Sequence, residues 1–173
     1  MTQNREDTGV WPPPVIDIEA SGFGRAGFPI EVGLILPDGR AWCTLVRPPS
    51  DWTHWDHVAQ DLHGITREQL TQHGMPVDEV ARALNQWLSQ RQVYTDSWAH
   101  DYPWLHRIFD AAGTLPRFRL ESVRILLDED QASRWASTRL QVSRSMHTTR
   151  HRASHDARVV QHTVAALLPH AVR

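Results

Sequence analysis

The chain has 173 residues, 40% of them hydrophobic, and it contains eight tryptophans. This length fits one compact domain, and this composition excludes a chain that is disordered throughout. No apolar stretch approaches the roughly 20 residues that cross a bilayer, so we predict no membrane segment and no membrane partner.

The formal net charge of −2 conceals an uneven distribution of charge along the chain. Residues 1–114 carry 8 arginines against 15 acidic residues, whereas residues 115–173 carry 10 arginines against 5. An acidic part beside an arginine-rich part suits a site that holds cations and meets an anionic ligand such as phosphate. Ordinary surface charge with internal ion pairs explains the same distribution equally well.

The N-terminal segment differs in composition from the rest of the chain. Residues 1–11 are mostly polar and contain no apolar run of the kind found in signal peptides, so we expect a flexible tail. A single domain is then expected over residues 12–173. The one cysteine, Cys43, cannot form an internal disulfide, which agrees with a reducing compartment, and we predict a cytoplasmic location.

The first regular element is a strand, VIDIE (residues 15–19), in which apolar and acidic residues alternate. A period of two places Asp17 and Glu19 on one face and the two isoleucines on the other. Two more strands are joined by Asp38-Gly39, a dipeptide typical of tight hairpins. They are expected over residues 30–37 and 41–46. The chain therefore opens with a three-stranded antiparallel meander.

Helical periodicity is the main signal in the rest of the chain. A Trp- and His-rich stretch is expected to form short helical turns broken by Gly64, and residues 128–149 are the least regular part, with room for a mobile loop. Asp101 is predicted to be the N-cap of a helix that has Pro103 in its first turn. The remaining elements are a helix from residue 75 or 76 to 88, a strand at 92–95, a strand running into a helix within 118–127, and a last helix with an apolar stripe from 157 to 167. This order predicts an α/β domain with a mixed sheet.

Four carboxylates and one histidine fall at the ends of these predicted elements. Asp17 and Glu19 lie on the first strand, Asp101 follows the strand at residues 92–95, and Asp156 begins the last helix with His151 just before it. Carboxylates in an apolar strand are costly unless a positive partner meets them. We therefore expect these side chains to share one pocket and to bind cations.

Two of these clusters resemble the motifs of the DEDDh family of 3′-to-5′ exonucleases. Residues 17–22 read DIEASG, which is similar to the family's first motif, Asp-x-Glu followed by a small polar residue and Gly. Residues 151–157 read HRASHDA, which is similar to its third motif, His-x-Ala-x-x-Asp-Ala. Order and spacing agree over nearly the whole chain. The resemblance implies an RNase H-like fold, in which α-helices flank the mixed sheet.

The resemblance also implies a reaction and a role for each residue. Phosphodiester hydrolysis by this family uses two divalent cations, and carboxylate ligands without cysteine favour Mg²⁺ or Mn²⁺. Asp17 would bridge the two ions, while Glu19, Asp101 and Asp156 would complete the ligand set. His151 would be the general base, and we place it in the loop before the helix because one helix would hold it about 140° away from Asp156.

The second motif departs from the family pattern, in which a His-Asn pair precedes a Phe-Asp pair. Here the stretch reads DSWAHD, residues 96–101. Asp101 takes the place of the metal-binding aspartate, with Asp96 as its rival because it ends a strand. His147 and His155 are rivals of His151 as the base, and we expect both to be solvated or close to phosphates.

Substrate contacts are implied by the same resemblance. The turn after the first strand would receive the 3′-terminal nucleotide, with Phe23 offering an apolar surface to its base, and a segment near Gly64 would pack beside it. Trp98 could stack on a base, whereas Trp104 is expected in the core. The arginines near the third motif, Arg144, Arg150 and Arg152, could pair with phosphates. The predicted substrate-binding residues are Ala20, Ser21, Gly22, Phe23, His63 and Ile65.

The leading hypothesis is a 3′-to-5′ exonuclease that acts on single-stranded nucleic acid ends or short oligonucleotides and releases nucleoside 5′-monophosphates. The irregular second motif leaves an alternative, an inactive module of the same fold that binds nucleic acid or a protein. The sequence does not distinguish DNA from RNA, and a homodimer remains open.

Overall fold

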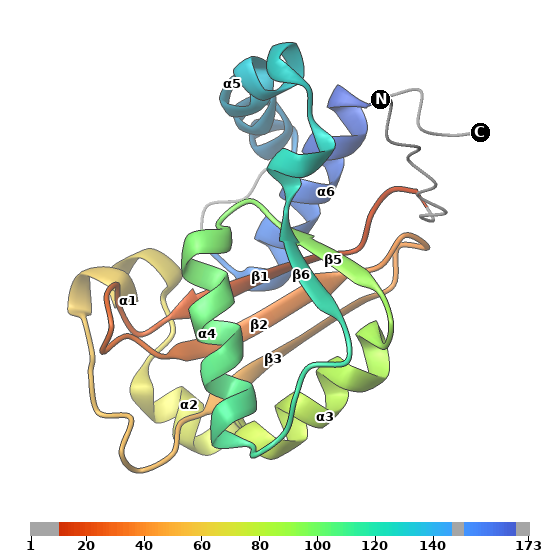
Figure 1. Cartoon of the computed structure of the whole chain (residues 1–173). Coiled ribbons are helices and arrows are strands. Elements are labelled where there is room, and N and C mark those ends of the chain that lie inside the picture. The colour runs from red at the N-terminus through yellow and green to blue at the C-terminus, as the bar shows by residue number, and fades with distance from the viewer. Residues whose placement is uncertain (1–10, 147–150, 169–173) are drawn as a thin grey trace.

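A six-stranded mixed sheet with helices on both faces forms the centre of the computed structural model, which describes residues 11–146 and 151–168 (Figure 1). The strands lie in the order β4-β3-β2-β1-β5-β6. Their bounds are β1 Val15–Ala20, β2 Pro29–Ile35, β3 Ala41–Arg47, β4 Met75–Pro76, β5 Gln92–Thr95 and β6 Arg119–Ser122.

The three-stranded antiparallel meander predicted from the sequence is confirmed. Strand β1 pairs with β2, and β2 pairs with β3, both antiparallel. The later strands extend this sheet in parallel, β5 beside β1 and β6 beside β5. Because β1 and β5 run in the same direction, their carboxyl ends point to the same side of the sheet, the side at which α/β proteins commonly bind ligands.

Helices connect and cover these strands. Their bounds are α1 His57–His63, α2 Arg67–His73, α3 Val77–Leu88, α4 Trp98–Ala111, the 3₁₀ turn η1 Val123–Leu126, α5 Glu129–Ser145 and α6 Ala153–Leu167. The two short helices in the Trp- and His-rich stretch are separated at Gly64, whose φ of 70° ends α1 in the left-handed conformation that glycine adopts readily. Within the described residues, no helix is both long and apolar enough to cross a bilayer.

The sheet separates two hydrophobic cores. Ile16 and Ile18 face the larger core together with residues of α3 and α4, including Leu84 and Leu105. Val15 faces the other side, where α6 and Trp135 of α5 complete a second core. Asp17 and Glu19 share the face of Val15 because side chains alternate along β1. The two acids therefore emerge on the side of the sheet that α6 covers.

The predicted start of the fourth helix is wrong. Ser97, not Asp101, is the N-cap of α4, and Asp101 lies in its first turn, where its N–H donates to the carbonyl of Ser97 at 3.0 Å. Pro103 sits inside the helix. A proline this close to the N-terminus removes only one backbone hydrogen bond, so the helix can begin one turn earlier than its position indicates.

The expectation of a mobile loop within residues 128–149 is also wrong over the described part of this segment. Residues 129–145 form α5, which begins with a capping box between Asp128 and Gln131. The Gln131 N–H donates to the Asp128 carboxylate at 2.8 Å, and the Gln131 side chain accepts from the Asp128 N–H at 2.9 Å. This reciprocal pair is a sequence signal for a helix start that outweighs the weak apolar periodicity of the segment.

Candidate active site

A cavity of about 250 Å³ opens where β1 and β5 end and where α4 and α6 begin. All five residues of the predicted acid and histidine set line it, although they come from three separate parts of the chain. The other lining residues are Ile18, Ala20, Gly22, Phe23, Ala59, Leu62, His63, Ser97, His100, Trp104 and Arg139.

Asp101 enters the cavity from the first turn of α4 and is only 1% exposed. The Thr95 hydroxyl at the end of β5 donates a hydrogen bond to its Oδ2 atom. Burial, and after it the charges of Asp96 and Glu19, raise the pKa of the Asp101 carboxyl to about 8, against the lowering effect of the Thr95 hydrogen bond. A cation beside this carboxyl would favour its ionised form.

Asp96, the rival of Asp101, has a different partner. Its Oδ2 atom accepts a hydrogen bond from Nε of Arg139 at 2.9 Å, and Asp96 is not among the residues that line the cavity. Arg139 projects from α5, and its Nη2 atom lies 4.0 Å from Oδ1 of Asp156. The arginine therefore bridges Asp96 and the wall of the cavity, whereas Asp101 faces the other acids.

Glu19, His151 and Asp156 lie close enough to share one ion. One ligand atom from each falls within 4.8 Å of the other two. Nδ1 of His151 is 3.4 Å from Oδ2 of Asp156, and His151 precedes α6, as its spacing from Asp156 predicts. The His151 side chain is 59% exposed, whereas that of Asp156 is 13% exposed. The histidine can therefore reach both solvent and the carboxylates.

The carboxylates of this cavity repel one another, and this repulsion adds to the effect of burial on their pKa values. Burial raises the pKa of Asp17 well above its usual range, and the charges of Asp101, Glu19 and Asp156 raise it further. Burial and the charge of Asp156 raise the pKa of Glu19 to about 7. Hard carboxylate oxygens gathered in this way fit hard divalent cations such as Mg²⁺ and Mn²⁺, which would relieve the repulsion.

The start of α6 reaches the acids because β2 carries a glycine there. Gly33 pairs with Asp17 across the strands, and a Cβ atom on Gly33 would lie only 2.2 Å from the backbone nitrogen of Ser154. A side chain at this position would therefore push the helix away from the sheet. Close packing of α6 on β2 brings Asp156 beside the acids of β1.

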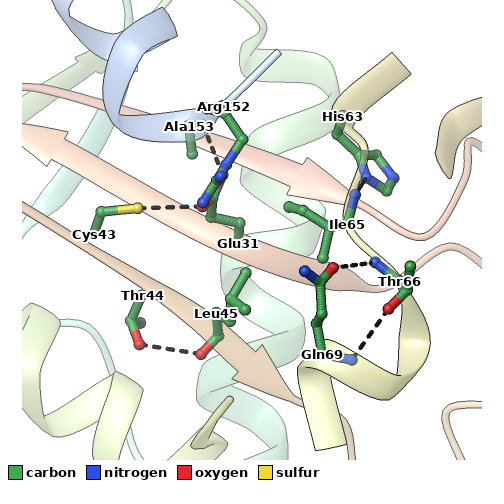
Figure 2. Close-up of polar contacts among 10 residues, drawn as sticks. All are labelled: Glu31, Cys43, Thr44, Leu45, His63, Ile65, Thr66, Gln69, Arg152 and Ala153. Atoms are coloured by element: carbon green, nitrogen blue, oxygen red, sulfur yellow. Dashed lines mark hydrogen bonds and ion pairs between the residues drawn. The ribbon is translucent and has the colours of Figure 1, made fainter. Parts of the chain in front are cut away.

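A second residue of β2, Glu31, was missed by the sequence analysis, which assigned it only to a strand. It is fully buried, and it pairs with Glu19 across the strands. Its carboxylate accepts hydrogen bonds from the Arg152 guanidinium, from the Ala153 N–H and from the Cys43 thiol (Figure 2). An acidic residue inside an otherwise apolar strand was the signal that could have identified it.

The predicted substrate-binding residues divide into two groups. Ala20, Gly22, Phe23 and His63 line the cavity. Ser21 and Ile65 are not among the lining residues, and both are buried. The Ser21 hydroxyl accepts the N–H of Phe28 at 3.1 Å, and the Ser21 carbonyl accepts the N–H of Asp56 at 2.8 Å. Ser21 thus closes the turn after β1.

His63 is a buried residue of the cavity lining, and its hydrogen bonds define the tautomer of its ring. Its Nδ1 atom accepts the N–H of Ile65 at 3.0 Å (Figure 2), so the neutral ring carries its hydrogen on Nε2. Burial lowers the pKa of His63, which favours this neutral form. The Nε2 atom is buried and has no hydrogen-bond partner among the described residues.

Aromatic rings form one wall of the cavity. Phe23, which is 66% exposed, lies 5.3 Å from the His100 ring and 6.3 Å from the Trp104 ring. Trp104 therefore lines the cavity while also packing against the core. Trp98, expected to stack on a base, does not line the cavity, and its Nε1–H donates to the carbonyl of Leu120 at 3.1 Å.

The other basic residues singled out from the sequence lie away from the cavity lining or outside the described residues. His155 and Arg152 are not lining residues, and Arg144 is exposed near the end of α5. His147 and Arg150 lie outside the described residues. Arg139, which no motif indicated, is the arginine that the described structure brings to the cavity.

Comparison with known proteins gives structural neighbours only. No protein-family model matches the chain, and no curated protein does. Among solved structures, the zinc-bound complex of E. coli exonuclease I with single-stranded DNA is similar, with a TM-score of 0.68 and 13% identity over 92% of this chain. Exonuclease I from Methylocaldum szegediense is also similar, with a TM-score of 0.68 and 14% identity over 92% of this chain.

The two matches cover 40% of each exonuclease I chain, so this chain spans about two fifths of their length. Similarity at this level of sequence identity shows a shared fold only. The six-stranded mixed sheet and the helices that flank it are the RNase H-like fold of exonuclease I.

Proposed function

We propose that this protein is a metal-dependent 3′-to-5′ exonuclease of the histidine-containing DEDDh type, which hydrolyses single-stranded nucleic acid from its 3′ end and releases nucleoside 5′-monophosphates. The observation that carries the proposal is the convergence of Asp17, Glu19, Asp101 and Asp156 with His151 around one cavity. The fold shared with exonuclease I supports it. We place the activity in the cytoplasm, in agreement with the single cysteine.

Two divalent cations, Mg²⁺ or Mn²⁺, would supply charge neutralisation at the scissile phosphate and an activated water. Asp17, Glu19, Asp101 and Asp156 would hold the ions. His151 stands beside Asp156 with a solvent-exposed ring, so it can take the proton of the attacking water and pass it to solvent. Its exposure allows that proton to leave without a relay through the core.

The 3′-terminal nucleotide would enter along the turn that follows β1. Phe23 offers an exposed ring to its base. A cavity of about 250 Å³ is smaller than the roughly 300–1,000 Å³ of pockets for drug-sized ligands. The cavity therefore has no room for more than one terminal nucleotide, and the rest of the strand would lie outside it.

The test is a trimming assay with a 5′-labelled single-stranded oligonucleotide in Mg²⁺ or Mn²⁺. We expect stepwise shortening from the 3′ end, no cleavage of a circular substrate, and no activity in EDTA. Asp17→Asn should lower kcat by at least about 10³-fold because it removes one carboxylate of the proposed ligand set. Asp38→Asn is the matched control, since Asp38 is an exposed acid in the β2–β3 hairpin, and its rate should equal that of the wild type.

Two results would contradict the proposal. Equal activity in the wild type and in Asp17→Asn would assign the cleavage to a contaminant. Retention of the oligonucleotide without cleavage in either ion would support the alternative, an inactive binding module. Parallel DNA and RNA oligonucleotides of matched sequence identify the preferred sugar.

A further inference from the structure

We propose that the ion pair between the buried Glu31 and the half-exposed Arg152 is a positioning element for the metal site, because it fixes the start of α6 and with it both His151 and Asp156. This inference rests on the proposed function, since it concerns the same cavity. Neither residue lines that cavity, so the pair would act through its neighbours.

Both carboxylate oxygens of Glu31 accept hydrogen bonds. Nε of Arg152 lies 3.0 Å from both carboxylate oxygens, and Nη2 of Arg152 donates to Oε1. The Ala153 N–H donates to Oε2 at 2.9 Å, and the Cys43 thiol donates to Oε1 at 3.4 Å. Every contact drawn to Glu31 in Figure 2 comes from a hydrogen-bond donor. Glu31 is thus engaged as an acceptor and is not available as a metal ligand.

Cys43 fits this arrangement as a neutral donor. Partial burial of its thiol, together with the charge of Glu31, raises the pKa of Cys43 to about 11. The thiol therefore keeps its hydrogen near neutral pH and can point it at the Glu31 carboxylate. The arginine provides the compensating charge that a buried carboxylate needs.

Arg152 occupies the position from which α6 starts. It is the N-cap of the helix, and its carbonyl accepts the Asp156 N–H at 2.9 Å. His151 is its neighbour in the chain. The Arg152 side chain does not cap α6 by a hydrogen bond to the helix backbone. Glu31, which belongs to β2, caps it instead, because its carboxylate accepts the first N–H of the helix, that of Ala153.

The pairing of β1 with β2 connects this anchor to the acids. Glu31 lies opposite Glu19, and Gly33 lies opposite Asp17. The anchor and the close approach of α6 at Gly33 therefore act on the same side of the sheet as the two acids. Residues that orient metal ligands from behind typically change metal affinity by 10- to 100-fold when they are altered.

The experiment measures Mn²⁺ binding by isothermal titration calorimetry on the full chain without nucleic acid, at a temperature where circular dichroism shows each variant to be folded. We expect Glu31→Gln to weaken Mn²⁺ binding about 10- to 100-fold. We expect Arg152→Lys to weaken it also, because a lysine keeps the charge but loses the planar fork. Arg152 is half-exposed, so this variant should fold even if Glu31→Gln does not.

The matched control is Arg82→Lys in the exposed Arg82–Asp78 pair of α3, whose atoms lie 3.2 Å apart and neither of whose residues lines the cavity. It should leave Mn²⁺ affinity unchanged. The double variant Glu31→Gln with Arg152→Lys should lose no more affinity than the stronger single variant, because the two residues act as one unit. Additive losses would contradict that coupling and overturn the inference.

Failure of this inference and failure of the proposed function give different results. If Mn²⁺ affinity is unchanged in both variants while the thermal midpoint falls, the pair only stabilises the fold and the inference is wrong, whatever the nuclease activity. A wild-type protein that binds no Mn²⁺ would also overturn it. If the variants weaken Mn²⁺ binding and the wild type cleaves no oligonucleotide, the inference stands and the proposed function fails.

Discussion

Asp17, Glu19 and Asp101 are the residues at which local chemistry and stability conflict most directly. Each is a carboxyl group whose pKa is raised in the folded protein, first by burial and then by neighbouring acids. In the unfolded chain the same groups ionise at their ordinary pKa, about 4. Without a cation, ionisation of these groups therefore favours the unfolded state.

This conflict predicts how stability depends on pH in the metal-free protein. Above pH 7 the unfolded chain has lost these protons, whereas the folded protein still holds part of the proton of Asp101, whose pKa is about 8. The folded state binds more protons, so the free energy of unfolding should fall as pH rises. We expect a fall of about 1–2 kcal/mol between pH 7 and 8.5, measured by urea unfolding in EDTA.

The control for this prediction is Asp101→Asn, which removes one of the raised groups. Its free energy of unfolding should vary less with pH and should exceed that of the wild type at pH 8.5. The lowered pKa of His63 has the opposite effect, because it makes the free energy of unfolding fall as the pH becomes acidic. Measurements between pH 7 and 8.5 avoid that contribution. A wild-type free energy that is constant or rises over this window would show that the acids are not coupled as described.

At the residue scale, sequence reasoning found the acids but not their partners. Alternation in one short strand is a local signal, and it placed Asp17 and Glu19 on one face. The Arg139–Asp96 and Arg152–Glu31 pairs join residues 43 and 121 positions apart. No periodicity connects such positions in a single sequence, because the pairing depends on how the elements pack.

At the scale of elements, the contact between β2 and α6 determines where His151 and Asp156 lie. The backbone of α6 contacts β2 directly at Gly33, where no side chain of the strand lies between them. The periodicity of α6 was clear from the sequence, but the depth of its packing depended on one glycine whose neighbours were unknown. By contrast, the start of α5 was encoded locally in its capping box and was overlooked.

Gly33→Ala tests this contact. The added Cβ would meet backbone atoms of Ala153 and Ser154 at 2.2–2.6 Å, so α6 must shift from the sheet. We expect the free energy of unfolding to fall by about 3 kcal/mol, since overpacked sites cannot relax when the neighbour is backbone. We also expect weaker Mn²⁺ binding, because Asp156 moves with the helix.

Gly113→Ala is the matched control for Gly33→Ala. Gly113 has a φ of 62°, and a Cβ added there would meet no atom of the described residues within 4 Å, so alanine adds backbone strain of about 1–2 kcal/mol without a steric contact among them. Its Mn²⁺ affinity should equal that of the wild type. If both variants bind Mn²⁺ as the wild type does, close packing at Gly33 has no role in the site.

At the scale of the whole molecule, ion pairs within the fold neutralise part of the uneven charge distribution. Arg139 and Arg152 of the arginine-rich part pair with Asp96 and Glu31 of the acidic part. Both readings of the sequence charge therefore apply, because internal ion pairs account for some arginines while Arg139 also reaches the cavity. With a net charge of −2, little positive charge is left to attract a long polyanion.

This charge balance predicts that affinity for single-stranded nucleic acid depends little on length and weakly on salt. Each phosphate neutralised on a single strand contributes about 0.7 to the slope of log Kd against log salt concentration. Arg139 is the one arginine among the described lining residues, so we expect a slope below about 1.5, equivalent to about two phosphates. The His151→Ala variant, which keeps all four carboxylates, allows this measurement by fluorescence anisotropy in Mg²⁺ with slow turnover.

Oligonucleotides of about 4, 8 and 16 nucleotides should bind within about threefold of one another, since only the terminal nucleotide is enclosed. A slope above about 3, or affinity that rises steadily with length, would instead require an extended phosphate-binding surface outside the cavity.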